Sequence, residues 1–169
     1  MSSRAACAFA WSLAVLSSAA AGDGPRSTPR SVDVRLGGPF RLAVAAASGR
    51  LSSAPCAAVL DRFVDSATGL PLGAALEATS LSAAEFVLGL TYYDASALPS
   101  CRNERTLAYT SPGSRVVFVC PTAFSRAARA EPGFAANVLI HEALHSLGLG
   151  DDLPSSVEIT RIVERACGR

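Results

Sequence analysis

Residues 141–152 of the chain read HEALHSLGLGDD. His141 and His145 are four residues apart, so on a helix both imidazoles project from one face, one turn apart. Two ring nitrogens placed in this way can reach one metal ion at about 2.0–2.1 Å. Glu142 lies to the side of the pair, where it can take a proton from a water on the metal without binding the metal itself. These residues predict a zinc site on a helix.

The helix that would carry this site is predicted over residues 133–147. Its apolar residues recur three and four positions apart and form one continuous stripe: Ala136, Leu139, Ile140, Ala143, Leu144 and Leu147. His141 and His145 lie off this stripe, which disfavours a pair of ordinary core histidines. Gly148 and Gly150 supply the permissive backbone that ends a helix. Asp151 follows ten residues after His141, and its carboxylate can complete the three protein ligands typical of a catalytic zinc.

Two further carboxylates compete for the third ligand position. Asp152 is adjacent to Asp151 and ranks second. Glu158 ranks third, because Ser155-Ser156-Val157-Glu158 before an apolar helix is a capping-box pattern that accounts for the glutamate without a metal. The Asp151-Asp152 pair could otherwise be a solvated turn or part of a weak calcium site.

The motif also carries a family resemblance. HEALHSLGLGD resembles the extended metzincin motif His-Glu-x-x-His-x-x-Gly-x-x-His/Asp, and it is most similar to the snapalysin-like secreted bacterial proteases, whose third ligand is an aspartate. The resemblance implies that His141, His145 and Asp151 bind zinc and that Glu142 is the general base and acid of peptide hydrolysis. It also implies a zincin-like sheet whose edge strand lines the substrate cleft above the active-site helix.

The chain departs from this family at one point. Metzincins carry a methionine turn downstream of the motif, whereas the only methionine here is Met1. We therefore expect either an apolar residue near Val157 or Ile159 in its place, or a separate minimal zincin. Peptide hydrolysis would also need a donor for the developing oxyanion. The candidates are Tyr92, Tyr93, Tyr109 and Arg115, and the sequence assigns none of them.

The rest of the chain predicts an α+β domain with an antiparallel or mixed sheet packed on the His141 helix. Alternating apolar residues predict strands at Phe40–Ala46 and Glu85–Tyr93. Segments 106–110 and 115–120 flank Ser-Pro-Gly-Ser and predict a hairpin. Short helices are expected at Ala57–Val64 and Leu72–Ala78, and longer ones at 122–130 and 156–166.

The N-terminus predicts export. Residues 1–21 combine a basic start, an apolar run of 12 residues and an Ala-x-Ala exit, the layout of a cleaved signal peptide. We expect a secreted or periplasmic protein with a flexible leader over residues 22–38 and a metallopeptidase domain over 39–169. The four remaining cysteines predict two disulfides. The hairpin favours Cys101–Cys120, which leaves Cys56–Cys167 to attach the last helix.

Composition narrows the possible partners. At 169 residues the chain is long enough for one domain, and a net charge of +1 without a basic run disfavours nucleic-acid binding. We therefore expect a monomeric zinc-dependent endopeptidase that acts on protein or peptide substrates, with no stable membrane insertion after signal cleavage. The alternative is a non-catalytic, disulfide-tied secreted binding domain that contains zinc.

Overall fold

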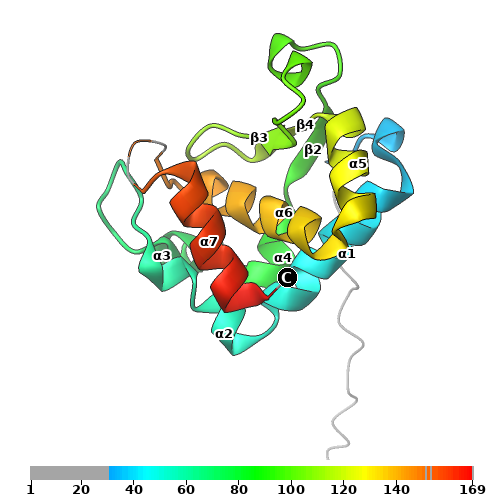
Figure 1. The fold of residues 1–169 in the computed structure, drawn as a ribbon. Coiled ribbons are helices and arrows are strands. Elements are labelled where there is room, and N and C mark those ends of the chain that lie inside the picture. Colours follow the sequence, from blue (N-terminus) through cyan, green and yellow to red (C-terminus); the bar gives the residue numbers. More distant parts are fainter. Residues whose placement is uncertain (1–30, 151, 153, 169) are drawn as a thin grey trace, which may run out of the picture.

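The structure, a computed structural model, describes residues 31–150, 152 and 154–168 and has mixed α+β architecture (Figure 1). In chain order its elements are β1 (Ser31–Val32), η1 (Val34–Leu36), α1 (Gly37–Leu51), α2 (Ala54–Ala57), η2 (Leu60–Arg62), α3 (Leu72–Glu77), α4 (Ala83–Leu88), β2 (Thr91–Asp94), η3 (Pro99–Arg102), β3 (Ala108–Tyr109), β4 (Val116–Val119), α5 (Pro121–Ala130), α6 (Pro132–Ser146) and α7 (Ser156–Cys167).

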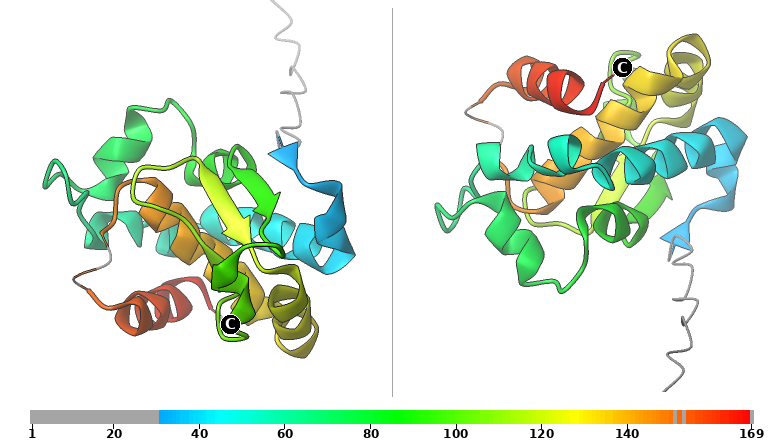
Figure 2. Two further views of the ribbon diagram at one scale, coloured as in Figure 1. Left: turned by 90° about the horizontal axis from the view of Figure 1, so that it is seen from above. Right: turned by 90° about the horizontal axis from the view of Figure 1, so that it is seen from below.

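The four strands form one small mixed sheet in the order β1-β2-β4-β3. β1, β2 and β4 are parallel, and β3 lies antiparallel to β4 at the edge. Tyr92 and Val117 are buried against the helices, while Tyr93 and Tyr109 each make a ring contact with Phe118. Figure 2 (left) views the sheet from its outer side, with α1 and α6 behind it. The prediction of a mixed sheet is confirmed.

α6 is the central helix of the domain. It contacts α1, α4, α5, α7 and the strands β3 and β4, and every residue from 139 to 146 is buried. Leu139, Ile140 and Leu144 of the predicted apolar stripe are almost completely buried, but His141 and His145 are buried as well, so the prediction that their place off the stripe separates them from core histidines is wrong. The helix ends at Ser146, and Gly148 follows with a φ of 114°, a conformation that favours glycine. The predicted helix end is therefore also confirmed.

The strand predicted at Phe40–Ala46 is wrong, because these residues lie in α1. Phe40, Ala43, Val44, Ala47 and Leu51 form the buried face of this helix, a three- and four-residue spacing. Leu42, which the alternating pattern would have placed inside, is 73% exposed. Alanine fits either pattern as an apolar residue, but it favours the helix.

The strand predicted at Glu85–Tyr93 is wrong in its first half. The Ser82 hydroxyl accepts a hydrogen bond from the backbone N–H of Glu85, while the Glu85 carboxylate accepts one from the backbone N–H of Ser82. This capping box starts α4. Only the end of the predicted segment is extended, in β2.

Most of the other predicted elements are confirmed. The hairpin forms as β3 and β4, and the helices at 72–78, 122–130 and 156–166 form as α3, α5 and α7. Segment 57–64 is only partly helical. Residues 31–38 belong to the folded domain through β1 and η1, so the leader expected over 22–38 is too long at its C-terminal end. The expected signal peptide lies outside the described residues.

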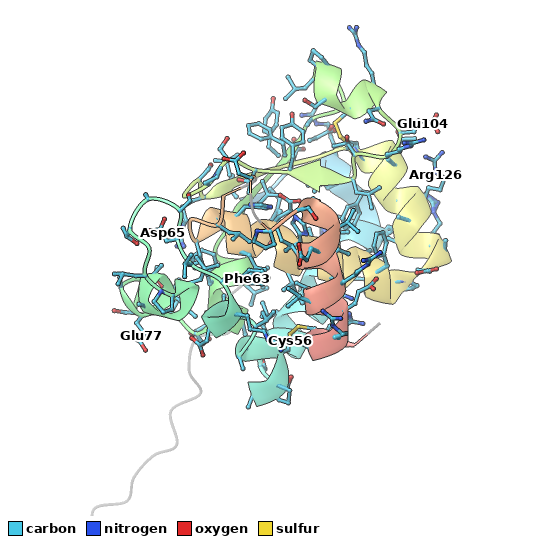
Figure 3. The ribbon with its side chains drawn as sticks, turned by 60° about the vertical axis from the view of Figure 1, so that its left-hand side comes forward. Cys56, Phe63, Asp65, Glu77, Glu104 and Arg126 are labelled. Carbon is cyan, nitrogen blue, oxygen red and sulfur yellow. A yellow bond between two sulfur atoms is a disulfide. The ribbon has the colours of Figure 1, made fainter. Side chains whose placement is uncertain are left out.

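Two disulfides hold the domain together, with the predicted pairing. Cys101–Cys120 joins η3 to the end of β4, and Cys56–Cys167 joins α2 to the end of α7 (Figure 3). Beside the second bond, Arg50 Nη1 donates to Asn137 Oδ1 (2.6 Å) and to the Gly168 carbonyl (2.9 Å). Asn137 Nδ2 also donates to Gly168 O (2.8 Å). The C-terminal end of α7 is thus fixed to α1, α2 and α6. Two disulfides are typical of proteins in an oxidising compartment.

Within the described residues, no single helix has the length and apolar composition needed to cross a membrane. One bent pair, Gly37–Leu51 with Ala54–Arg62, meets those criteria together at an angle of 94°.

Candidate metal centre

The structure brings His141 and His145 together on one face of α6, as predicted. Their Nε2 atoms are 3.0 Å apart, and the two side chains are 7% and 4% exposed. Two imidazoles on one tetrahedral zinc have ligand nitrogens about 3.3 Å apart, given Zn–N distances of about 2.0–2.1 Å. The spacing of the pair therefore fits a shared metal ion.

The other nitrogen of each ring shows which atoms carry the protons. His145 Nδ1 lies 2.8 Å from the carbonyl oxygen of Leu149, which can only accept, so this nitrogen donates. His141 Nδ1 lies 3.1 Å from the Thr160 hydroxyl. That hydroxyl already donates its proton to Ser156 O (2.9 Å), so it accepts from His141. Both neutral rings are assigned to the Nδ1–H tautomer from these partners.

When both rings are neutral, both Nε2 atoms are unprotonated, and they lie 3.0 Å apart. Two lone pairs at 3.0 Å repel, and a cation shared between them removes that repulsion. Burial, and to a smaller extent the neighbouring His145, lower the pKa of His141 to about 3. His141 is thus neutral at pH 7, the form in which imidazole binds metals. These donors fit zinc.

Glu142 lies beside the pair and is 6% exposed. Burial is the main cause that raises the pKa of the Tyr92 hydroxyl, and the negative charge of Glu142 raises it further. The Glu142 carboxylate therefore lies near Tyr92 of β2. Burying a carboxylate in this way is expensive, and strongly perturbed or buried ionisable groups gather at functional sites. Glu142 is thus a buried carboxylate that lines the same groove as His141.

The site opens into a groove of about 300 Å³. Its wall on one side is the segment leading into the edge strand β3, and α6 and α7 form the rest. The lining residues are Arg105, Thr106, Leu107, Ala108, Phe134, Val138, His141, Glu142, Ser156 and Thr160. An edge strand thus borders the groove that contains both His141 and Glu142.

A larger groove lies elsewhere, between α1, α2, α3 and α4, with a volume of about 680 Å³. Its polar lining includes Asp61, Glu77 and Ser82, and it contains neither histidine. The larger groove is therefore not the one that contains His141 and Glu142.

The third ligand is not visible in the described part of the chain. Asp151 lies outside it. Asp152 and Glu158 are exposed, and no group of three or more His, Cys, Asp or Glu side chains among residues 31–150, 152 and 154–168 could hold a metal ion. The capping box expected at Ser155 is wrong, since Ser155 makes no side-chain bond to the start of α7. Neither alternative carboxylate joins the histidine pair.

None of the four oxyanion candidates lines the groove. Tyr92 is buried and donates its hydroxyl proton to Val87 O (2.7 Å). Tyr93 and Tyr109 contact the ring of Phe118, and the Arg115 guanidinium lies 4.3 Å from the ring centre of Phe86. Sequence reasoning missed Arg105, the one cationic residue that lines the groove. Its only signal is a position shortly before the predicted hairpin.

The two residues considered in place of the missing methionine differ sharply in their exposure to solvent. Ile159 is fully buried, whereas Val157 is 61% exposed. Of the two, only Ile159 packs into the hydrophobic core, and it precedes Thr160 in α7.

Comparison with known proteins finds no matching family model, no matching curated protein and no matching solved structure. Membership of the metzincin group thus stays a prediction from the motif.

Proposed function

We propose that the chain is an exported zinc-dependent endopeptidase that hydrolyses protein or peptide substrates. The observation that carries the proposal is the pair of Nε2 atoms of His141 and His145 3.0 Å apart, with His141 and Glu142 lining one open groove. His141, His145 and Asp151 would hold the zinc. When bound, the metal supplies a Lewis acid that polarises a peptide carbonyl and acidifies water to a pKa of about 7.

The chain's own residues supply the proton transfer and the binding surface. Glu142 takes the proton of the attacking water and returns it to the leaving amine. The segment before β3 lies along the groove, and a peptide bound there in extended form could add to the sheet edge. The disulfides support the export part of the proposal.

The role of Glu142 is tested by Glu142→Gln. The variant should bind about one zinc per chain, as the unmodified protein does, and should lose at least about 100-fold in peptide cleavage, because a general base has been removed. Zinc content is measured by elemental analysis and cleavage with a broad peptide library. Glu158→Gln, on the exposed face of α7, is the control and should retain both properties. Full cleavage by Glu142→Gln would remove Glu142 from the mechanism.

The third ligand is tested with a neighbouring pair of variants. Asp151→Ala should weaken zinc binding strongly because one of three protein ligands is lost, while Asp152→Ala should bind zinc as the unmodified protein does. Competition with a chelator of known affinity measures both. The opposite ranking would transfer the ligand role to Asp152.

One observation favours a second function, a non-catalytic zinc-containing binding domain. None of the tyrosines considered as oxyanion donors lines the groove. Stoichiometric zinc with no cleavage of any library peptide would support this second function and contradict the peptidase.

A further inference from the structure

The two histidines of the candidate site are anchored by very different groups. Leu149 O, which holds His145, is a backbone carbonyl four residues further along the same segment. Thr160 Oγ1, which holds His141, is a side chain on another helix, 19 residues away in sequence. Only the second anchor depends on the identity of a side chain.

Thr160 is fixed as an acceptor by its own helix. Its hydroxyl donates to Ser156 O (2.9 Å), one turn earlier in α7, a bond that threonine commonly makes in helices. With its proton engaged, the oxygen offers His141 Nδ1 only lone pairs. A hydrogen bond of this kind selects the ring tautomer with the proton on Nδ1.

The alternative tautomer would change the site. With its proton on Nε2, His141 would donate to Nε2 of a neutral His145, which is 3.0 Å away. The two imidazoles would then hydrogen-bond to each other, and their Nε2 atoms would no longer both be available to a metal. A direct hydrogen bond between the two imidazoles would therefore compete with metal binding.

We infer that Thr160 holds His141 in the Nδ1–H tautomer and thereby prevents the two imidazoles from hydrogen-bonding to each other, which keeps both Nε2 atoms available to a metal. Thr160 is a positioning residue in this role, since it touches the imidazole rather than a substrate. The metal-binding part of the inference rests on the proposed function. The tautomer part does not.

Thr160→Val tests the inference, because valine keeps the shape and removes the acceptor. Nitrogen NMR of ¹⁵N-histidine distinguishes a protonated from an unprotonated ring nitrogen, and the chain contains only two histidines. In the metal-free variant the proton of His141 should move to Nε2, while Nδ1 of His145 stays protonated because Leu149 O is unchanged. His145 therefore reports that the site is still folded.

Zinc affinity gives the second measurement, by competition with a chelator. Thr160→Val should bind zinc about 10- to 100-fold more weakly, the usual effect of losing a partner of a metal-bound histidine. Thr160→Ser retains the hydroxyl and should restore both the tautomer and the affinity. Thr122→Val, an exposed threonine in α5, controls for the substitution itself.

The results separate the two proposals. If the unmodified protein binds no zinc, the proposed function fails, while the metal-free NMR still tests the tautomer. If the unmodified protein binds zinc but Thr160→Val shows the same His141 tautomer and the same affinity, the role of Thr160 is overturned and the proposed function stands.

Discussion

Gly148 is the residue on which the end of α6 most depends. Its φ of 114° favours glycine, and a Cβ built on it would lie 2.6 Å from Asp65 Oδ1. The Asp65 carboxylate cannot easily yield, because it accepts hydrogen bonds from the backbone of Ala67 and the hydroxyl of Thr68. The same two bonds lower the pKa of Asp65. Leu149, whose carbonyl anchors His145, comes next in the chain.

Gly148→Ala should therefore lower the free energy of unfolding by about 1–3 kcal/mol, the usual range for a strained backbone position. Urea denaturation measures the change. Gly38→Ala is the control, since a Cβ there would meet nothing within 4 Å, and it should change stability by less than about 0.5 kcal/mol. Equal stabilities of the two variants would contradict the strain assigned to Gly148.

At the residue scale, the sequence predicted contacts between side chains of one helix and missed contacts between side chains of two different helices. The meeting of His141 and His145 follows from the helical period alone. The contact of His141 with Thr160 depends on how α7 lies against α6 (Figure 1), and no spacing in the chain encodes that crossing. The same reason explains why Arg105 was not foreseen in the groove.

At the scale of elements, the errors fall where apolar patterns were ambiguous. Phe40 and Val44 fit a helical stripe as well as a period-two strand, and the alanines of α1 decide for the helix. The capping box of Ser82 and Glu85 is a helix-start signal in the sequence, but the alternating apolar residues after Glu85 predict a strand instead. The second half was predicted well because Pro121, Pro132 and Gly148 mark helix boundaries.

At the scale of the whole molecule, the two disulfides close loops of very different length. Cys56–Cys167 spans 111 residues and Cys101–Cys120 spans 19. In the chain-entropy description, the longer loop restricts the unfolded state more, corresponding to about 5 kcal/mol against about 3 kcal/mol.

The double variant Cys56→Ser/Cys167→Ser should therefore lose more stability than Cys101→Ser/Cys120→Ser. Urea denaturation of both under the same conditions measures the difference. A larger loss for the Cys101/Cys120 pair would show that native packing around η3, rather than loop length, dominates.

The Cys56–Cys167 bond would have a further consequence under the proposed peptidase function. A peptidase at high concentration meets other copies of itself, and segments between helices are common sites of cleavage. A cut between Ser146 and Ser156 would leave α7 covalently joined to α2 through Cys56–Cys167, with its end still hydrogen-bonded to Arg50 and Asn137. A nicked molecule would keep α7, and Thr160 with it, attached to the rest of the domain. The Cys56–Cys167 disulfide would thus keep the domain together after cleavage by another copy of the chain, in addition to stabilising it against unfolding.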